Sequence, residues 1–65
     1  MKALSEKELT RILIANGFKL IRQSGHQIYG NGIINVAVPR SRKNLSFVIC
    51  RFVLRKAGIF VEGVT

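Results

Sequence analysis

The chain has 65 residues and a formal net charge of +8, because eleven Lys and Arg residues outnumber three acidic ones. A hydrophobic content of 48% is enough for the core of a single domain, which we assign to residues 1–65. No apolar run approaches the roughly 18 residues of a membrane-spanning helix, and the polar first residues lack the pattern of a signal peptide. These features argue against a membrane-spanning or secreted protein, and we expect a cytoplasmic location.

The excess of positive charge has two interpretations. Basic residues can simply keep a small protein soluble, or they can bind a polyanion. Nucleic acid is favoured over a membrane surface, because the basic residues are spread along the chain and are not confined to one face of an amphipathic helix. We therefore expect an affinity for RNA that falls as the salt concentration rises.

The first predicted element is a helix over residues 6–16. Ser5 and Glu8 have the spacing of a capping box, in which each side chain accepts a hydrogen bond from a free backbone N–H at the start of the helix. Gly17 predicts the end of this helix. Apolar residues at helical spacing predict a buried stripe of Leu9, Ile12 and Leu13.

Short runs rich in aromatic and β-branched residues follow, and they predict strands. Residues 18–23 and 26–29 are expected to form a hairpin whose strands are divided by Ser24-Gly25. Tyr29 is three residues beyond His26, so on a regular strand the two side chains point to opposite faces. We interpret Tyr29 as a residue of the core or of the sheet surface, and not as a general acid.

A third strand is predicted after the turn signal Gly30-Asn31-Gly32. It covers residues 33–38 and ends at Pro39. The residues of this strand that share one face, and that we expect the helices to cover, are Ile34, Val36 and Val38.

The next segment, Arg40-Ser41-Arg42-Lys43, has no apolar residue to bury, so it is either solvated or bound to a partner. A second helix is predicted from an N-cap at Ser46 to about Ala57, with Gly58 ending it. Arg51 and Arg55 share its outer face, where they serve either solubility or phosphate contact. The predicted core stripe of this helix consists of Ile49, Phe52, Val53 and Ala57.

The last residues, 59–65, are too apolar for a solvated end, so they either dock on the core or pair with a partner. The order of the elements predicts an α+β domain of the α-β-β-β-α type. We expect a three-stranded antiparallel sheet with both helices on one face, as in double-stranded RNA-binding domains.

The residues that could hold a metal ion are few and scattered. Cys50 lies in an apolar stretch, where a free cysteine usually behaves as a small hydrophobic residue. The chain has one His, one Cys and three acidic residues, which do not form the ligand set of a structural zinc site or of a two-metal nuclease. We expect no metal and no cofactor, and any catalysis to be metal-independent.

Two parts of the chain carry a family resemblance. Residues 16–29 contain Asn-Gly-Phe leading into a strand and Arg-Gln before a Gly-His element, and residues 36–59 contain a Val-Pro pair and a terminal Lys-Ala-Gly-Ile. In this order and spacing the motifs resemble the HicA toxins, also called YcfA-like proteins, over nearly the whole chain. The resemblance implies a double-stranded RNA-binding-like fold, endoribonuclease activity on mRNA and neutralisation by a HicB-type antitoxin. It also implies that His26 is the catalytic residue.

Cleavage of RNA without a metal needs a base to take the proton from the ribose 2′-OH, and positive donors to stabilise the charge that develops on the phosphate. Histidine suits the first task, because it is the residue type whose ordinary pKa lies near physiological pH. The chain has no second histidine to protonate the leaving oxygen, so we expect slow catalysis. The expected RNA-contacting residues are Arg22, Gly25, Arg40, Arg42 and Lys43, where Gly25 would let the RNA backbone come close.

Three other interpretations remain open at this stage. His26 can be an ordinary histidine at the start of a strand, hydrogen-bonded to the backbone. The domain can be a non-catalytic RNA-binding module, which would contact phosphates and 2′-OH groups without cutting. It can also act mainly through assembly with its antitoxin and repression of its own operon, with the basic surface and the apolar tail as the interface.

Overall fold

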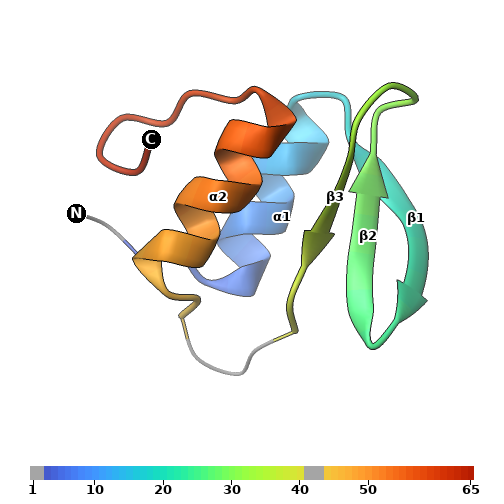
Figure 1. The fold of residues 1–65 in the computed structure, drawn as a ribbon, viewed down its shortest axis with the longest axis horizontal. Helices are drawn as coiled ribbons and strands as arrows, with labels where there is room; N and C mark the ends of the chain where they lie inside the picture. The colour runs from blue at the N-terminus through green and yellow to red at the C-terminus, as the bar shows by residue number, and fades with distance from the viewer. Residues whose placement is uncertain (1–2, 41–43) are drawn as a thin grey trace.

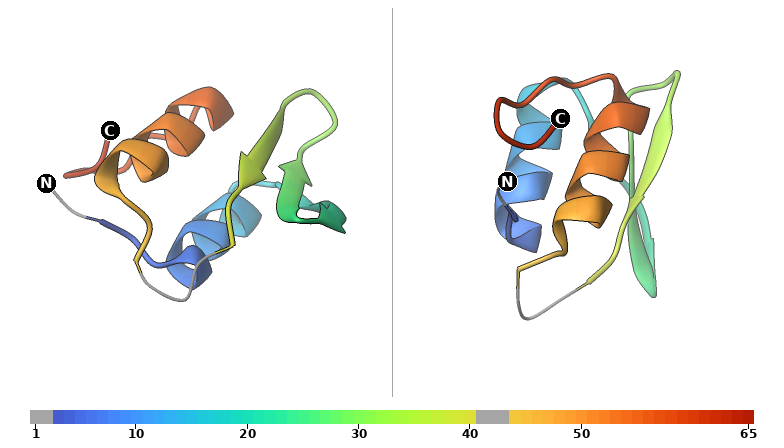
Figure 2. Two further views of the ribbon diagram at one scale, coloured as in Figure 1. Left: turned by 60° about the horizontal axis from the view of Figure 1, so that its bottom comes forward. Right: turned by 60° about the vertical axis from the view of Figure 1, so that its left-hand side comes forward.

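The protein is a single α+β unit in a computed structural model, which describes residues 3–40 and 44–65. The elements follow the predicted order, as Figure 1 shows: α1 (Glu6–Ala15), β1 (Lys19–Ser24), β2 (His26–Gly30), β3 (Asn35–Val38) and α2 (Phe47–Ala57). The strands form one antiparallel sheet in the order β1-β2-β3. Both helices lie on the same side of this sheet (Figure 2), so its other side stays open. In the part of the chain that is described, no helix is long and apolar enough to cross a membrane.

The ends of the helices follow the local sequence. The Ser5 N–H donates to the Glu8 carboxylate at 3.0 Å and the Glu8 N–H donates to the Ser5 hydroxyl at 3.1 Å, which confirms the predicted capping box. The Ser46 hydroxyl caps α2 in the same way by accepting from the backbone N–H of Ile49 at 3.2 Å. Gly58 ends α2 with a φ of 75°, a left-handed conformation that favours glycine.

The third strand is shorter than predicted. The Asn31 side-chain oxygen accepts hydrogen bonds from the backbone N–H groups of Ile33 at 2.9 Å and Ile34 at 2.7 Å. These bonds hold residues 31–34 in a turn, because the two N–H groups are then engaged locally and not in the sheet. The strand begins only at Asn35, and Ile33 is 89% exposed.

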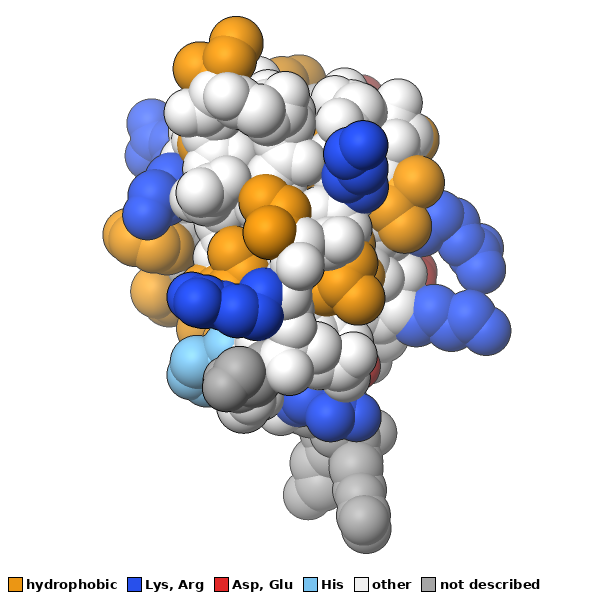
Figure 3. Space-filling model, turned by 90° about the vertical axis from the view of Figure 1, so that its right-hand side faces the viewer, with side chains coloured by type: hydrophobic (Ala, Val, Ile, Leu, Met, Phe, Trp, Pro, Cys, Tyr) orange, Lys and Arg blue, Asp and Glu red, His pale blue; other side chains and the backbone are white. Residues whose placement is uncertain are grey.

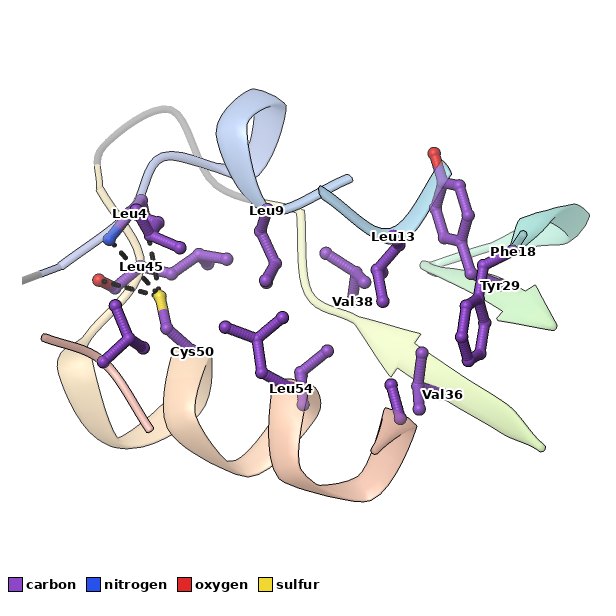
Figure 4. Packing of buried hydrophobic residues seen from close by; sticks show 13 residues of the cluster. Leu4, Leu9, Leu13, Phe18, Tyr29, Val36, Val38, Leu45, Cys50 and Leu54 are labelled. Atoms are coloured by element: carbon purple, nitrogen blue, oxygen red, sulfur yellow. Dashed lines mark hydrogen bonds between the residues drawn. The ribbon is translucent and has the colours of Figure 1, made fainter. Parts of the chain in front are cut away.

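The core lies between the sheet and the two helices, as Figure 4 shows. Leu9 and Leu13 of α1 are fully buried, as predicted, whereas Ile12 of the same predicted stripe is half-buried and packs against the core. On β3, alternation buries Val36 and Val38. The buried residues are Leu4, Leu9, Leu13, Phe18, Tyr29, Val36, Val38, Leu45, Cys50, Val53, Leu54, Ala57 and Val64.

The predicted core position of Phe52 is wrong. Its side chain is 66% exposed, while Cys50 and Leu54 are fully buried. Residues advance by about 100° around a helix, so Phe52 lies about 200° from both of these residues and points away from the core. Leu54 occupies the position on the inner face that the prediction gave to Phe52.

Cys50 joins the segment before α1 to the start of α2. Its sulfur accepts a hydrogen bond from the Leu4 backbone N–H at 3.4 Å and lies 3.7–3.8 Å from the carbonyl oxygens of Leu4 and Leu45. The Leu45 N–H also donates to the Leu4 carbonyl at 2.9 Å. The cysteine is a buried part of the packing, in agreement with its prediction as a small hydrophobic residue.

The C-terminal residues dock on the core. Val64 is buried, and its backbone N–H donates to the Val61 carbonyl at 3.0 Å, so the chain turns back on itself. Of the two predicted alternatives, docking is therefore the one observed for Val64. Phe60 does not take part in this packing and is 78% exposed.

Candidate functional site

The open face of the sheet carries His26. Tyr29 is buried on the helix side of β2, so of its two predicted positions the core is the one observed, and strand alternation places His26 and Ile28 on the opposite face. Residues directly opposite each other in an antiparallel pair share a face, so the pairing of Arg22 with Ile28 places this arginine on the open face too. Both His26 and Arg22 are exposed to solvent.

The local register brings Arg22 and His26 close together. His26 pairs with Ser24, and Arg22 is two residues before Ser24 on the same strand. Arg22 and His26 are therefore diagonal cross-strand neighbours, whose Cβ atoms lie about 7–8 Å apart in a regular antiparallel sheet. This distance is within the reach of an arginine side chain, so a single phosphate group can contact both residues.

A register shift between Leu20 and Arg22 adds a second cation to the open face. Residues three apart on a regular strand point to opposite faces. Beyond this shift Leu20 pairs with Tyr29 and Lys19 pairs with Gly30, so Lys19 shares the open face with Arg22. Lys19 was not among the predicted site residues, because no residue type in β1 indicates the register shift.

Glycine is required at position 30, where the open face is closely packed. A Cβ atom on Gly30 would overlap the side chains of Ile21 and Asn35. These two side chains therefore lie over Gly30 on the open face, at the opposite end of β2 from His26. At the other end of β2, the side chain of His26 is exposed.

Arg40 approaches the same end of the sheet from β3. Val38 pairs with Gln27, and the antiparallel direction carries the following residues, Pro39 and Arg40, toward the turn between β1 and β2. Figure 1 shows this turn and the end of β3 at the same end of the sheet. Arg40 is exposed. In Figure 3, which looks at this side of the molecule, the pale blue histidine lies beside Lys and Arg side chains.

Gly25 forms the tight connection between β1 and β2. Its φ of 80° is left-handed, so the turn itself requires glycine whether or not RNA approaches. A Cβ atom there would meet no other atom within 4 Å, so the space in front of this turn is open. Two further residues expected to contact RNA, Arg42 and Lys43, lie outside the described residues.

The charged residues Lys19 and Arg22 of the sheet are both cationic. None of the three strands contains an acidic residue, and the acidic residues Glu6 and Glu8 belong to the first turn of α1. Within residues 3–40 and 44–65, no group of three or more His, Cys, Asp or Glu side chains could hold a metal ion. The sheet thus presents cations that can attract a polyanion, with Arg22 and Arg40 at the end that carries the exposed imidazole of His26 and Lys19 at the opposite end.

The fold and this site define a class of small α+β domain with an open, cationic sheet face and one exposed histidine. Comparisons of the chain with protein-family models, with curated proteins and with solved structures found no match. The chemistry of the open face is therefore the guide to a function.

Proposed function

We propose that this domain is a metal-independent endoribonuclease, a toxin of the HicA type that cleaves mRNA in the cytoplasm and is neutralised by a HicB-type antitoxin. The observation that supports it is the solvent-exposed His26 on an acid-free sheet face, with Arg22 diagonal to it and Arg40 at the same end. The α-β-β-β-α order and the coverage of one sheet face by both helices support a double-stranded RNA-binding-like fold within this proposal.

In the proposed reaction, the His26 imidazole takes the proton from a ribose 2′-OH. The 2′-oxygen then attacks the adjacent phosphorus, and the bond from phosphorus to the 5′-oxygen of the next nucleotide breaks. Arg22 and Arg40 stabilise the negative charge that develops on the phosphate oxygens, and water protonates the leaving 5′-oxygen. The products are an RNA end with a 2′,3′-cyclic phosphate and an RNA end with a free 5′-OH.

A second function, a non-catalytic RNA-binding module, is favoured by the absence of an acid on the open face. Tyr29, the nearest side chain on β2 with an ionisable hydroxyl, is buried on the opposite side of the sheet. Among the described residues, the open face offers cations that bind phosphate but no acidic residue that could protonate the leaving oxygen. This alternative predicts protection of RNA without cleavage.

Incubation of an end-labelled transcript with the purified chain in the presence of EDTA separates the two functions. We expect slow accumulation of fragments that end in 2′,3′-cyclic phosphate, because the proposed attack uses the 2′-oxygen. A matched substrate with a 2′-deoxy nucleotide at the main cleavage position should not be cut there. Fragments that end in a 3′-OH, or RNA that is retarded on a gel but stays intact, would contradict the proposal.

Replacement of Arg22 with alanine should weaken RNA binding and reduce its dependence on salt. Each phosphate contact contributes about 0.7–0.9 to the slope of log affinity against log salt, so the loss of one contact should lower the slope by about this amount. Filter binding over a salt series measures both effects. Arg11→Ala, which removes an exposed arginine on α1, is the matched control and should leave the slope unchanged. Equal slopes for the Arg22→Ala and unaltered chains would show that Arg22 makes no phosphate contact in the complex with RNA.

A further inference from the structure

The outer side of α2 has an apolar hollow between cationic side chains, and the proposed cleavage site does not include it. The hollow is shallow, with a volume of about 540 Å³. Val48 and Phe52 supply its apolar surface and are 73% and 66% exposed. The cations that line it are Arg51, Arg55 and Lys56.

Helical geometry places these residues on one face. Val48 and Phe52 are four residues apart, and Arg55 and Lys56 follow at the next turn, so all lie along one side of α2. This side points away from Leu54, which is fully buried in the core. The exposed apolar side chains therefore contribute nothing to the packing between α2 and the sheet, so the fold itself does not require them.

A second hollow continues this surface beyond the end of α2. It has a volume of about 360 Å³ and shares Arg55 with the first hollow. Phe60, which is 78% exposed, lines it together with Gly58 and Ile59. From Val48 to Lys56 the helix rises by about 12 Å, so the apolar surface is long enough to contact two turns or more of a partner helix.

We propose that this surface, which we call the α2 groove (Val48, Arg51, Phe52, Arg55, Lys56 and Phe60), binds an acidic segment of a partner protein that carries apolar side chains. Its organisation is that of a protein interface, with an apolar centre, an aromatic anchor and a rim that contains arginine. The three cations have no acidic residue beside them within α2, so carboxylates of a partner would complement them.

Two other occupants fit the groove less well. A lipid surface is bound by an apolar face that projects into the acyl region, whereas the apolar side chains here line a hollow between cations. Single-stranded RNA uses successive aromatic side chains on which bases stack, whereas the two exposed aromatic residues of the groove, Phe52 and Phe60, line two different hollows. A protein segment can both fill the hollow with apolar side chains and contact the cations with carboxylates.

Selection of peptides against the folded chain tests this inference. A phage-displayed library of linear peptides of about 16 residues, long enough for about four helical turns, is selected on the immobilised chain in the absence of RNA. We expect the enriched peptides to combine several Asp or Glu residues with apolar ones. Bound to the isotope-labelled chain, a synthetic copy of the strongest peptide should shift the backbone amide resonances of residues 48–56.

Two pairs of variants then assign the contact. Phe52→Ala and Arg55→Glu should each lower the affinity of the chain for the peptide by at least about tenfold, as expected for residues at the centre of an interface. Ile14→Ala and Arg11→Glu make matched changes at exposed positions of α1. Their affinity for the peptide should stay within about twofold of that of the unaltered chain. All four positions are exposed, and circular dichroism checks that the variants stay folded.

Several results would overturn the inference. They are enrichment of peptides without acidic residues, equal peptide affinity for Phe52→Ala and the unaltered chain, or amide shifts confined to the sheet. Binding to vesicles of phosphatidylcholine and phosphatidylserine that is stronger than peptide binding and is lost in Phe52→Ala would assign the groove to lipid. The same result with an oligouridylate would assign it to RNA. The readout is peptide affinity without RNA, so the inference does not depend on the proposed ribonuclease activity, and each can fail without the other.

Discussion

Replacement of His26 with alanine is expected to abolish detectable RNA cleavage while RNA affinity and stability stay close to those of the unaltered chain. General acid–base catalysis by one positioned side chain typically accelerates a reaction by about 10²- to 10⁴-fold, and a slow enzyme that loses this factor falls below the detection of a gel assay. The side chain of His26 is exposed and its removal leaves no cavity in the core. The measurement is the rate of fragment formation from a labelled transcript.

A matched variant and a rescue experiment show whether this loss is chemical. Lys19→Ala changes an exposed residue of the same sheet face at the opposite end of the sheet, and it should keep most of the cleavage rate. Free imidazole added to His26→Ala should restore part of the rate, because it can enter the open space that the side chain leaves and accept the proton. Undiminished cleavage by a folded His26→Ala chain would refute the assignment of His26 as the base.

The largest effect on stability is expected for Leu54→Ala. Leu54 is fully buried between α2 and the other core side chains (Figure 4), and replacement of a buried leucine by alanine typically costs about 2–5 kcal/mol. At roughly 0.05–0.15 kcal/mol per residue, a chain of 65 residues has a free energy of unfolding of only about 3–10 kcal/mol. The variant should therefore be partly or wholly unfolded at 37 °C.

Urea denaturation followed by circular dichroism measures this loss. The matched control is Ile14→Ala, which removes the same number of carbon atoms from a side chain that is 58% exposed. Its free energy of unfolding should change by about 0.5 kcal/mol or less. Similar losses of stability for the two variants would show that Leu54 is not a core residue through which α2 packs on the rest of the protein.

The helices were predictable because the signals for their ends are local. Ser5 and Glu8 are three residues apart, and their mutual hydrogen bonds depend on little beyond that spacing. Ser46 and Gly58 act in the same way at the two ends of α2. The strands were predictable from short runs of aromatic and β-branched residues. The start of β3 lies two residues later than predicted, because the Asn31 side-chain oxygen accepts hydrogen bonds from the backbone N–H groups of Ile33 and Ile34.

The face of α2 that is buried was not predictable from the helix alone. Apolar residues occupy most positions from 47 to 54, so the hydrophobic pattern allows more than one orientation of the helix. The neighbouring elements select one of them by packing against Cys50 and Leu54, and Phe52 then remains outside. The groove that we assign to a partner segment is the direct result of this choice.

The sequence alone accounts for the order of the elements, for the excess of positive charge and for the presence of a single histidine, His26, because each of these is a property of local residues or of composition. Tertiary structure decides which cations share a face with that histidine. The register shift in β1 brings Lys19 to the same face of the sheet as Arg22. The antiparallel pairing of β3 brings Arg40 to the end of the sheet where His26 lies. Both follow from the register of the backbone hydrogen bonds between neighbouring strands, which the residues of one strand alone do not specify.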